Sequence, residues 1–238
     1  MAVLGVFTGC GSPAADLAAE VRLLERAAGG ECGLLLCSWP SPVVVLGYGQ
    51  GSSDVDLDWC RAAGVPVLRR STGGTGVVHC ADLAVSLVLP KVHPWAGRIM
   101  GLYGSFLDAL APALRAAGGD VRRPEVARRS RSERSPICFE DQLAETLVVG
   151  GRKAVGCAQA RRTRAVLVHA AVLLDLDAEL WARVFRVPAE RVEGALAPAV
   201  PGGDWQTVGT LVAEYLARAL GLERVAQPLP ALPRLAPP

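Results

Sequence analysis

The chain has 238 residues, of which 51% are apolar and 20% charged, and its formal net charge is +2. This balance is that of a globular protein with a sizeable core, and the small charge argues against nucleic acid as a partner. The N-terminal run Met1–Phe7 lacks the basic flank of a signal peptide and is too short to span a membrane. Seven cysteines without a Cys-x-x-Cys pair favour free thiols in the cytoplasm over disulfides or a metal site.

Hydrophobic periodicity and turn signals predict the secondary structure. In chain order, we expect a helix at 13–28, strands at 34–37 and 43–46, a helix at 54–63, strands at 65–68 and 83–89, a helix at 98–117, a hairpin of 143–149 and 154–160, a strand at 166–174 and, after a mostly helical region, a helix at 204–220. The basic stretch 122–136 has no periodicity, which predicts a mobile loop.

Two local details are specific enough to test. The first helix should bury a face made of Leu17, Val21, Leu24 and Ala28, because these residues recur at helical spacing. The helix at 54–63 should be capped by Ser53 or Asp54, since both side chains accept hydrogen bonds from the first turn.

The order of elements indicates an α+β fold. Strands mostly follow strands through short turns, and no regular strand–helix alternation appears, so a mainly antiparallel sheet is favoured over a parallel one. We expect one domain over residues 1–226. The tail 227–238 carries five prolines and is expected to be disordered.

Lys153 is unusual in this sequence. Only two of the 25 basic side chains are lysines, Lys91 and Lys153. A lysine in an arginine-rich chain suggests a site that needs a compact ammonium, although a surface lysine without a role fits as well. The glycines of segment 69–79 suit close approach of backbone N–H groups to a ligand, but they match neither the Walker nor the dinucleotide-binding pattern, and a plain tight turn fits them equally well.

Four segments in register resemble the lipoate–protein ligase and octanoyltransferase family. They are Trp39-Pro40-x-Pro42-Val43-Val44-Val45-Leu46-Gly47-x-x-Gln50, Arg70-x-Thr72-Gly73-Gly74-x-Gly76-Val77-x-His79, Gly151-Arg152-Lys153-x-x-Gly156-x-Ala158-Gln159 and His169-x-x-Val172-Leu173-Leu174-Asp175. The resemblance extends from about residue 8 to about residue 185. It implies the fold of the biotin and lipoate ligase superfamily, a mixed, mainly antiparallel sheet flanked by helices.

The resemblance also implies an acyl pocket in which Lys153 contacts the carbonyl of the lipoyl or octanoyl group. The residues expected to bind the substrate are Arg70, Thr72, Gly73, Gly74, Gly76, His79, Gly156, Gln159 and His169. Two activities share the family: ATP-dependent ligation of lipoate, and transfer of octanoate from acyl carrier protein through a cysteine thioester.

Cys138 favours the transferase. Ile137-Cys138-Phe139 lies fifteen residues before Lys153 and is similar to the Cys-Phe dipeptide of Gram-positive-type octanoyltransferases. The resemblance then implies Cys138 as nucleophile, no cofactor and no metal. The implied partners are acyl carrier protein and the lipoyl domains of 2-oxoacid dehydrogenases or the glycine cleavage H protein.

Alternatives stay open. A ligase catalytic domain without its accessory domain would instead use ATP and Mg²⁺. Cys80, Cys157 and Ala170 depart from the usual aspartate, serine and glycine, which motivates a non-catalytic lipoyl- or acyl-binding protein as a third interpretation. A cysteine is more often a small buried hydrophobe than a nucleophile, and the histidines could be structural. The arginines of segment 122–134 form either a solvated loop or a surface that steers acidic partners.

Overall fold

A computed structural model describes residues 2–125 and 146–230. Its main sheet has the strand order β10-β1-β2-β6-β9-β8-β7. The strands are β1 (Val3–Thr8), β2 (Cys32–Cys37), β6 (Leu83–Pro90), β7 (Leu147–Val149), β8 (Arg152–Arg161), β9 (Ala165–Val172) and β10 (Glu223–Ala226). β1 pairs in parallel with β2 and β10, and the other pairs are antiparallel. The predicted mixed, mainly antiparallel sheet is therefore confirmed.

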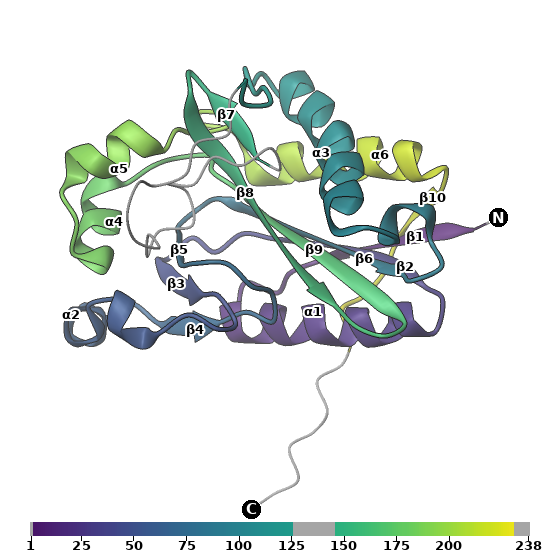
Figure 1. The fold of residues 1–238 in the computed structure, drawn as a ribbon, viewed down its shortest axis with the longest axis horizontal. Coiled ribbons are helices and arrows are strands. Elements are labelled where there is room, and N and C mark those ends of the chain that lie inside the picture. The colour runs from purple at the N-terminus through teal and green to yellow at the C-terminus, as the bar shows by residue number, and fades with distance from the viewer. Residues whose placement is uncertain (1, 126–145, 231–238) are drawn as a thin grey trace, which may run out of the picture.

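A second, smaller sheet has the order β4-β3-β5. It consists of β3 (Val43–Leu46), β4 (Val67–Arg69) and β5 (Val77–His79). Helix α1 (Pro13–Ala28) covers one face of the main sheet, while α3 (Ile99–Ala116) and α6 (Trp205–Leu220) pack against each other on the opposite face (Figure 1). The remaining helices are η1 (Ser52–Asp54), α2 (Leu57–Ala62), η2 (Pro94–Ala96), α4 (Ala178–Phe185) and α5 (Ala189–Ala195).

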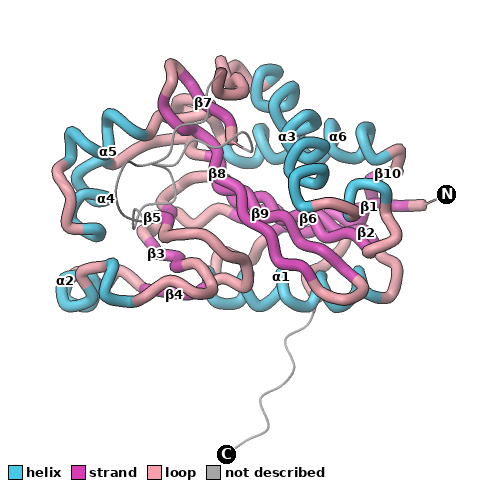
Figure 2. The backbone as a smooth tube through the Cα atoms, viewed as in Figure 1, coloured by secondary structure: helices cyan, strands magenta, loops and turns pink. Residues whose placement is uncertain are grey.

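Within the described residues, the apolar core consists of three clusters, two of which lie on opposite faces of the main sheet. Figure 2 shows the sheet between α1 on one face and the α3–α6 pair on the other. The larger apolar cluster lies between the main sheet and the α3–α6 pair, and a smaller one lies under α1. A third cluster joins the second sheet to α2, α4 and α5. The second sheet therefore lies beside the cluster under α1, and their junction holds most of the predicted site.

The predicted hairpin is confirmed over its described part. β7 and β8 pair on either side of Gly150 and Gly151, whose φ angles are +57° and +76°. Positive φ at both turn positions is the geometry that matches the twist of a two-stranded ribbon, and glycine adopts it without steric cost. Residues 143–145 of the predicted hairpin lie outside the described residues, as does most of the basic segment 122–136.

Helix α1 has the predicted ends but buries a different face. Its buried residues are Asp16, Ala19, Glu20, Leu23, Leu24 and Ala27, whereas Val21 is 41% exposed. Leu24 is buried as predicted, and Leu17 and Ala28 are partly buried against the same cluster. The prediction was wrong for Val21 and missed the rest of the face, because it counted only apolar positions and two carboxylates occupy the buried stripe. Asp16 accepts hydrogen bonds there from Trp39 Nε1 (2.9 Å) and from the backbone N–H of Cys10 (2.8 Å).

The predicted cap of the second helix was also wrong. A 3-10 turn takes Ser52–Asp54, and α2 then begins at Leu57, where the Asp56 side chain accepts the N–H of Trp59. Asp56 caps the helix in place of Ser53 or Asp54 because it directly precedes the first helical residue.

The start of the Pro-rich tail is bonded to the rest of the chain. Gln227 donates its N–H to the Val6 carbonyl (2.8 Å), and its side-chain oxygen accepts from Arg26 (3.1 Å). Residues 231–238 lie outside the described residues.

Candidate functional site

A buried arginine shapes the glycine-rich loop between β4 and β5. Arg70 donates from Nη1 to the Val45 carbonyl (3.1 Å) and from Nη2 to the carbonyls of Gly73 (2.8 Å) and Thr75 (2.9 Å). A planar guanidinium can hold several carbonyls at fixed angles. Arg70, predicted to bind substrate, therefore also fixes the course of the loop.

Close packing explains the glycines at two positions, and a positive φ explains a third. A Cβ atom on Gly47 would lie 2.0 Å from the Gly74 carbonyl oxygen, and one on Gly76 would lie 2.8 Å from ring carbons of Phe185. Gly74 has a φ of +89°, which side chains rarely adopt. By contrast, nothing lies within 4 Å of a Cβ built on Gly73. Gly73 is thus the loop glycine with open space beside it.

The same loop buries hydroxyl groups that have no hydrogen-bond partner in the described part of the chain. Thr72 is fully buried, and neither its Oγ1 nor the Oγ of Ser71 has a hydrogen-bond partner among the described residues. Leaving a buried hydroxyl unpaired costs about 1–3 kcal/mol, so such groups usually face a ligand or water. This supports the prediction that Thr72 belongs to a binding site.

Two carboxylate–histidine pairs lie side by side next to the loop. His79 Nδ1 is 2.7 Å from Asp82 Oδ2, and His169 Nδ1 is 2.5 Å from Glu20 Oε1. The imidazole rings are perpendicular, with centroids 6.3 Å apart. His79 comes from the second sheet and His169 from the main sheet, so the structure brings together two histidines that are distant in sequence.

Sequence reasoning missed Glu20. The carboxylate lies on the buried stripe of α1 and is 2% exposed. The signal was available, because Glu20 follows Asp16 by one helical turn and shares its face. Asp82 and Ser86 were likewise given no role from the sequence.

Lys153 lies on β8 near the hairpin turn and is 6% exposed. Its backbone carbonyl accepts the N–H of Ala197 (3.1 Å), and the β7–β8 register shifts beside it. The structure therefore places the unusual lysine in a fixed, buried strand position. A surface lysine without a role, the other sequence interpretation, does not fit this burial.

Gly156 and Gln159 lie on opposite faces of β8. Gly156 pairs with Ala171, on the face shared by His169 and α1, whereas Gln159 pairs with Val168 on the α3 face. The Gln159 side chain donates to the Ile99 carbonyl (2.8 Å) at the start of α3. The structure thus does not bring this side chain to the histidines, although the Gln159 carbonyl lies 3.5 Å from the Gly73 nitrogen.

Four of the six described cysteines are poor candidates for an activated thiol. Burial raises the pKa of Cys32, Cys37, Cys60 and Cys80, and nearby carboxylates raise that of Cys80 further. Cys80 Sγ lies 3.8 Å from the Pro40 carbonyl oxygen. The predicted nucleophile Cys138 lies outside the described residues.

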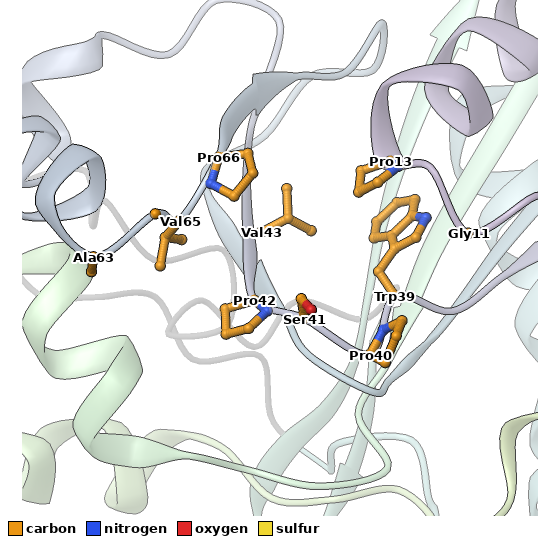
Figure 3. A pocket seen from close by; sticks show the side chains of 11 residues that line it. Gly11, Pro13, Trp39, Pro40, Ser41, Pro42, Val43, Ala63, Val65 and Pro66 are labelled. Carbon is orange, nitrogen blue, oxygen red and sulfur yellow. The ribbon is translucent and has the colours of Figure 1, made fainter.

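A hollow of about 460 Å³ opens on the outer side of the segment that joins β2 to β3 (Figure 3). Prolines 13, 40, 42 and 66 and Trp39 contribute to its lining, which contains no titratable side chain. The Trp39 ring lies 5.0 Å from that of His79. The residues that line this hollow therefore offer no titratable side chain to act on a substrate.

The described residues contain neither a metal-binding cluster nor a membrane-spanning helix. No group of three or more His, Cys, Asp or Glu side chains in ranges 2–125 and 146–230 is arranged to hold a metal ion. Within the same ranges, no helix is long and apolar enough to cross a bilayer.

Comparison with known proteins places the chain among lipoylation enzymes. The family model "Lipoyl protein ligase A/B catalytic domain" matches residues 12–229. The chain is 34% identical to the octanoyltransferase LipM of Kyrpidia tusciae, across 79% of this chain and 72% of the relative. It is 30% identical to the octanoyltransferase LipM of Geobacillus kaustophilus, across 90% and 79%.

Solved structures agree on the fold. A lipoate–protein ligase A bound with ATP superimposes with a TM-score of 0.78 at 24% identity, across 96% of this chain and 89% of that one. A chain from the bi-partite lipoate protein ligase of Thermoplasma acidophilum, analysed with its E2 lipoyl domain, gives 0.77 at 22% identity, across 97% and 88%. At these identities the likeness concerns the fold alone.

Proposed function

Because the chain belongs to the lipoyl protein ligase A/B catalytic domain family, we propose that it is an octanoyltransferase of protein lipoylation. The observation that carries this proposal is the match to proteins named octanoyltransferase, at 34% and 30% identity over most of both chains. The resemblance inferred from the glycine-rich and lysine motifs is confirmed at the level of the family.

The reaction runs in two acyl-transfer steps. The Cys138 thiolate attacks the thioester carbonyl of octanoyl–acyl carrier protein; a new thioester forms on Cys138, and the carrier thiol leaves. The lysine amine of a lipoyl domain then attacks this thioester. An amide forms, the amine loses a proton, and the Cys138 thiol is regenerated.

The described residues supply the binding part of this scheme. Lys153 offers a buried ammonium for the acyl carbonyl and its developing negative charge. The open space beside Gly73 and the Thr72 hydroxyl, which has no partner within ranges 2–125 and 146–230, suit close approach of the acyl group. The six cysteines of ranges 2–125 and 146–230 are free thiols, in keeping with a cytoplasmic enzyme.

Intact mass spectrometry tests the proposal. The protein is incubated with octanoyl–acyl carrier protein without ATP, and a single octanoyl adduct is expected. The adduct should vanish in Cys138→Ala and persist in Cys80→Ala, a matched control at a thiol whose pKa is raised. Addition of a lipoyl domain, or of the H protein, should discharge the adduct onto its lysine.

Other outcomes identify the rivals. Modification of the lipoyl domain only with free lipoate, ATP and Mg²⁺, unaffected by Cys138→Ala, would make the chain a ligase. Binding of octanoate or of a lipoyl domain without any turnover would make it a non-catalytic binding protein. Either result overturns the transferase.

A further inference from the structure

A single carboxylate on α1 connects three elements at the centre of the site. Glu20 Oε1 lies 2.5 Å from His169 Nδ1 on β9 and accepts the hydroxyl of Ser86 on β6. The exposed fractions of Glu20, Ser86 and His169 are 2%, 3% and 4%. Since the three side chains come from separate elements, this contact exists only in the folded chain.

The surroundings favour the ionised form of Glu20. Burial alone would raise its pKa, but the charge and hydrogen bond of His169, the Ser86 hydroxyl and the charge of Arg70 outweigh burial, so the pKa lies below its ordinary value. Asp16 on the same helix and Cys37 on β2 also lie near, since both carboxylates raise the pKa of the Cys37 thiol.

An ionised Glu20 determines which nitrogen of His169 carries a proton. A carboxylate only accepts hydrogen bonds, so Nδ1 carries a proton both in the neutral ring and in the charged ring whose charge lowers the pKa of Glu20. Among the described residues, Nε2 of His169 makes no hydrogen bond, and neither does Nε2 of His79. In both imidazoles, Nδ1 is therefore held by a carboxylate, and Nε2 has no hydrogen-bond partner among the described residues.

We propose that Glu20 is a positioning residue of the acyl-transfer reaction, which fixes the Nδ1–H form and the orientation of His169 and so presents Nε2 to the acyl site. Ser86 holds the carboxylate in the required rotamer by donating to the same oxygen. The inference rests on the proposed function in one respect, namely that the reaction is acyl transfer. The state of His169 can be measured without turnover.

The first test is ¹⁵N NMR of the histidine ring nitrogens in the full-length protein, assigned by comparison with His169→Gln. The wild-type spectrum should show a protonated Nδ1 at His169. In Glu20→Gln the amide can donate as well as accept, so a mixture of ring forms is expected. An unchanged His169 signal in Glu20→Gln would overturn the proposal.

The second test measures octanoyl transfer. Glu20→Gln should lower kcat/KM about 10- to 100-fold, the effect usual for a group that orients a functional histidine. The double variant Glu20→Gln/His169→Gln should be no slower than His169→Gln alone, because both changes remove one function. Losses that multiply would contradict action through His169.

Two controls separate positioning from folding and from the assigned reaction. Glu20→Asp keeps the charge and should recover part of the Glu20→Gln loss, which a merely structural defect would not show. If the wild-type protein moves no octanoyl group, the proposed function fails. The NMR comparison then decides by itself whether Glu20 sets the state of His169.

Discussion

The two faces of the main sheet bury different chemistry. On the α3–α6 face, every buried side chain contributed by the described residues of α3 and α6 is apolar or glycine. On the α1 face, Asp16, Glu20, Ser86 and His169 are buried together. One face of the sheet is thus an ordinary apolar core, whereas the other combines a smaller apolar cluster with a polar cluster fixed by hydrogen bonds.

Because of this difference, substitutions on the two faces should affect different properties of the protein. An apolar face stabilises through buried area and tolerates small shifts, whereas a buried polar cluster depends on each partner being present. The chain places its predicted acyl site, the histidine pairs and the glycine-rich loop against the second face. Substitutions on the first face should change folding alone, and those on the second should change activity as well.

The largest expected effect is on the apolar face. Phe106 is fully buried between α3 and the sheet, so Phe106→Ala should lower the free energy of unfolding by about 3–5 kcal/mol. Denaturant titration measures the loss. Ile99→Ala on the same helix is the control, since Ile99 is 55% exposed and its truncation should have little effect. If kcat/KM per folded molecule also fell in Phe106→Ala, the separation of the two faces would be wrong.

In the glycine-rich loop beside the polar cluster, adding a single methyl group should change activity as well as, or instead of, stability. In Gly76→Ala the new Cβ would lie 2.8 Å from the Phe185 ring, so we expect a loss of about 1–3 kcal/mol in unfolding free energy together with lower activity. Gly73→Ala meets no atom within 4 Å and should leave stability unchanged while lowering octanoyl transfer. Equal stability losses in the two variants would contradict the loop geometry.

The sequence predicts the elements whose pattern is local. The ends of α1, α3 and α6 and the Gly150–Gly151 turn follow from helical spacing and from glycine at positive φ. β1 and β10 were missed because they pair in parallel across more than two hundred residues, and β10 is exposed throughout. β5 has only three residues, too few for a periodic signal.

The site is less predictable than the fold. The motifs pointed to Lys153, His79 and His169, but their partners Glu20 and Asp82 come from the tertiary structure. Glu20 sits in a stripe that periodicity assigns to apolar residues, so hydrophobicity alone rejects it. Gln159 shows the opposite failure, because strand alternation sends its side chain to the α3 face although its motif neighbours face the site.

Acid should weaken the polar face before it affects the apolar one. Since the pKa of Glu20 is lowered in the folded protein, its contribution to stability is complete above about pH 4.5 and is lost as the pH falls through the folded-state value. In Glu20→Gln, the unfolding free energy should therefore fall less steeply as the pH is lowered. The slope should decrease by the amount that one bound proton contributes. Asp204→Asn is the control: that pKa is also lowered, mainly by the N–H of Thr207, but the carboxyl is exposed and its share should disappear in high salt.

The smallest effect is expected where the apolar face accepts a methyl group. Gly209 lies inside α6, and a Cβ there would approach the end of the flexible Leu36 side chain at 3.3 Å. Alanine gains about 1 kcal/mol of helix propensity over glycine, which should roughly offset this crowding. Gly209→Ala should thus change the unfolding free energy by less than about 1 kcal/mol and leave octanoyl transfer unchanged. A loss as large as that of Gly76→Ala would mean that the α6 face is packed as rigidly as the loop, and that polarity alone distinguishes the two sides.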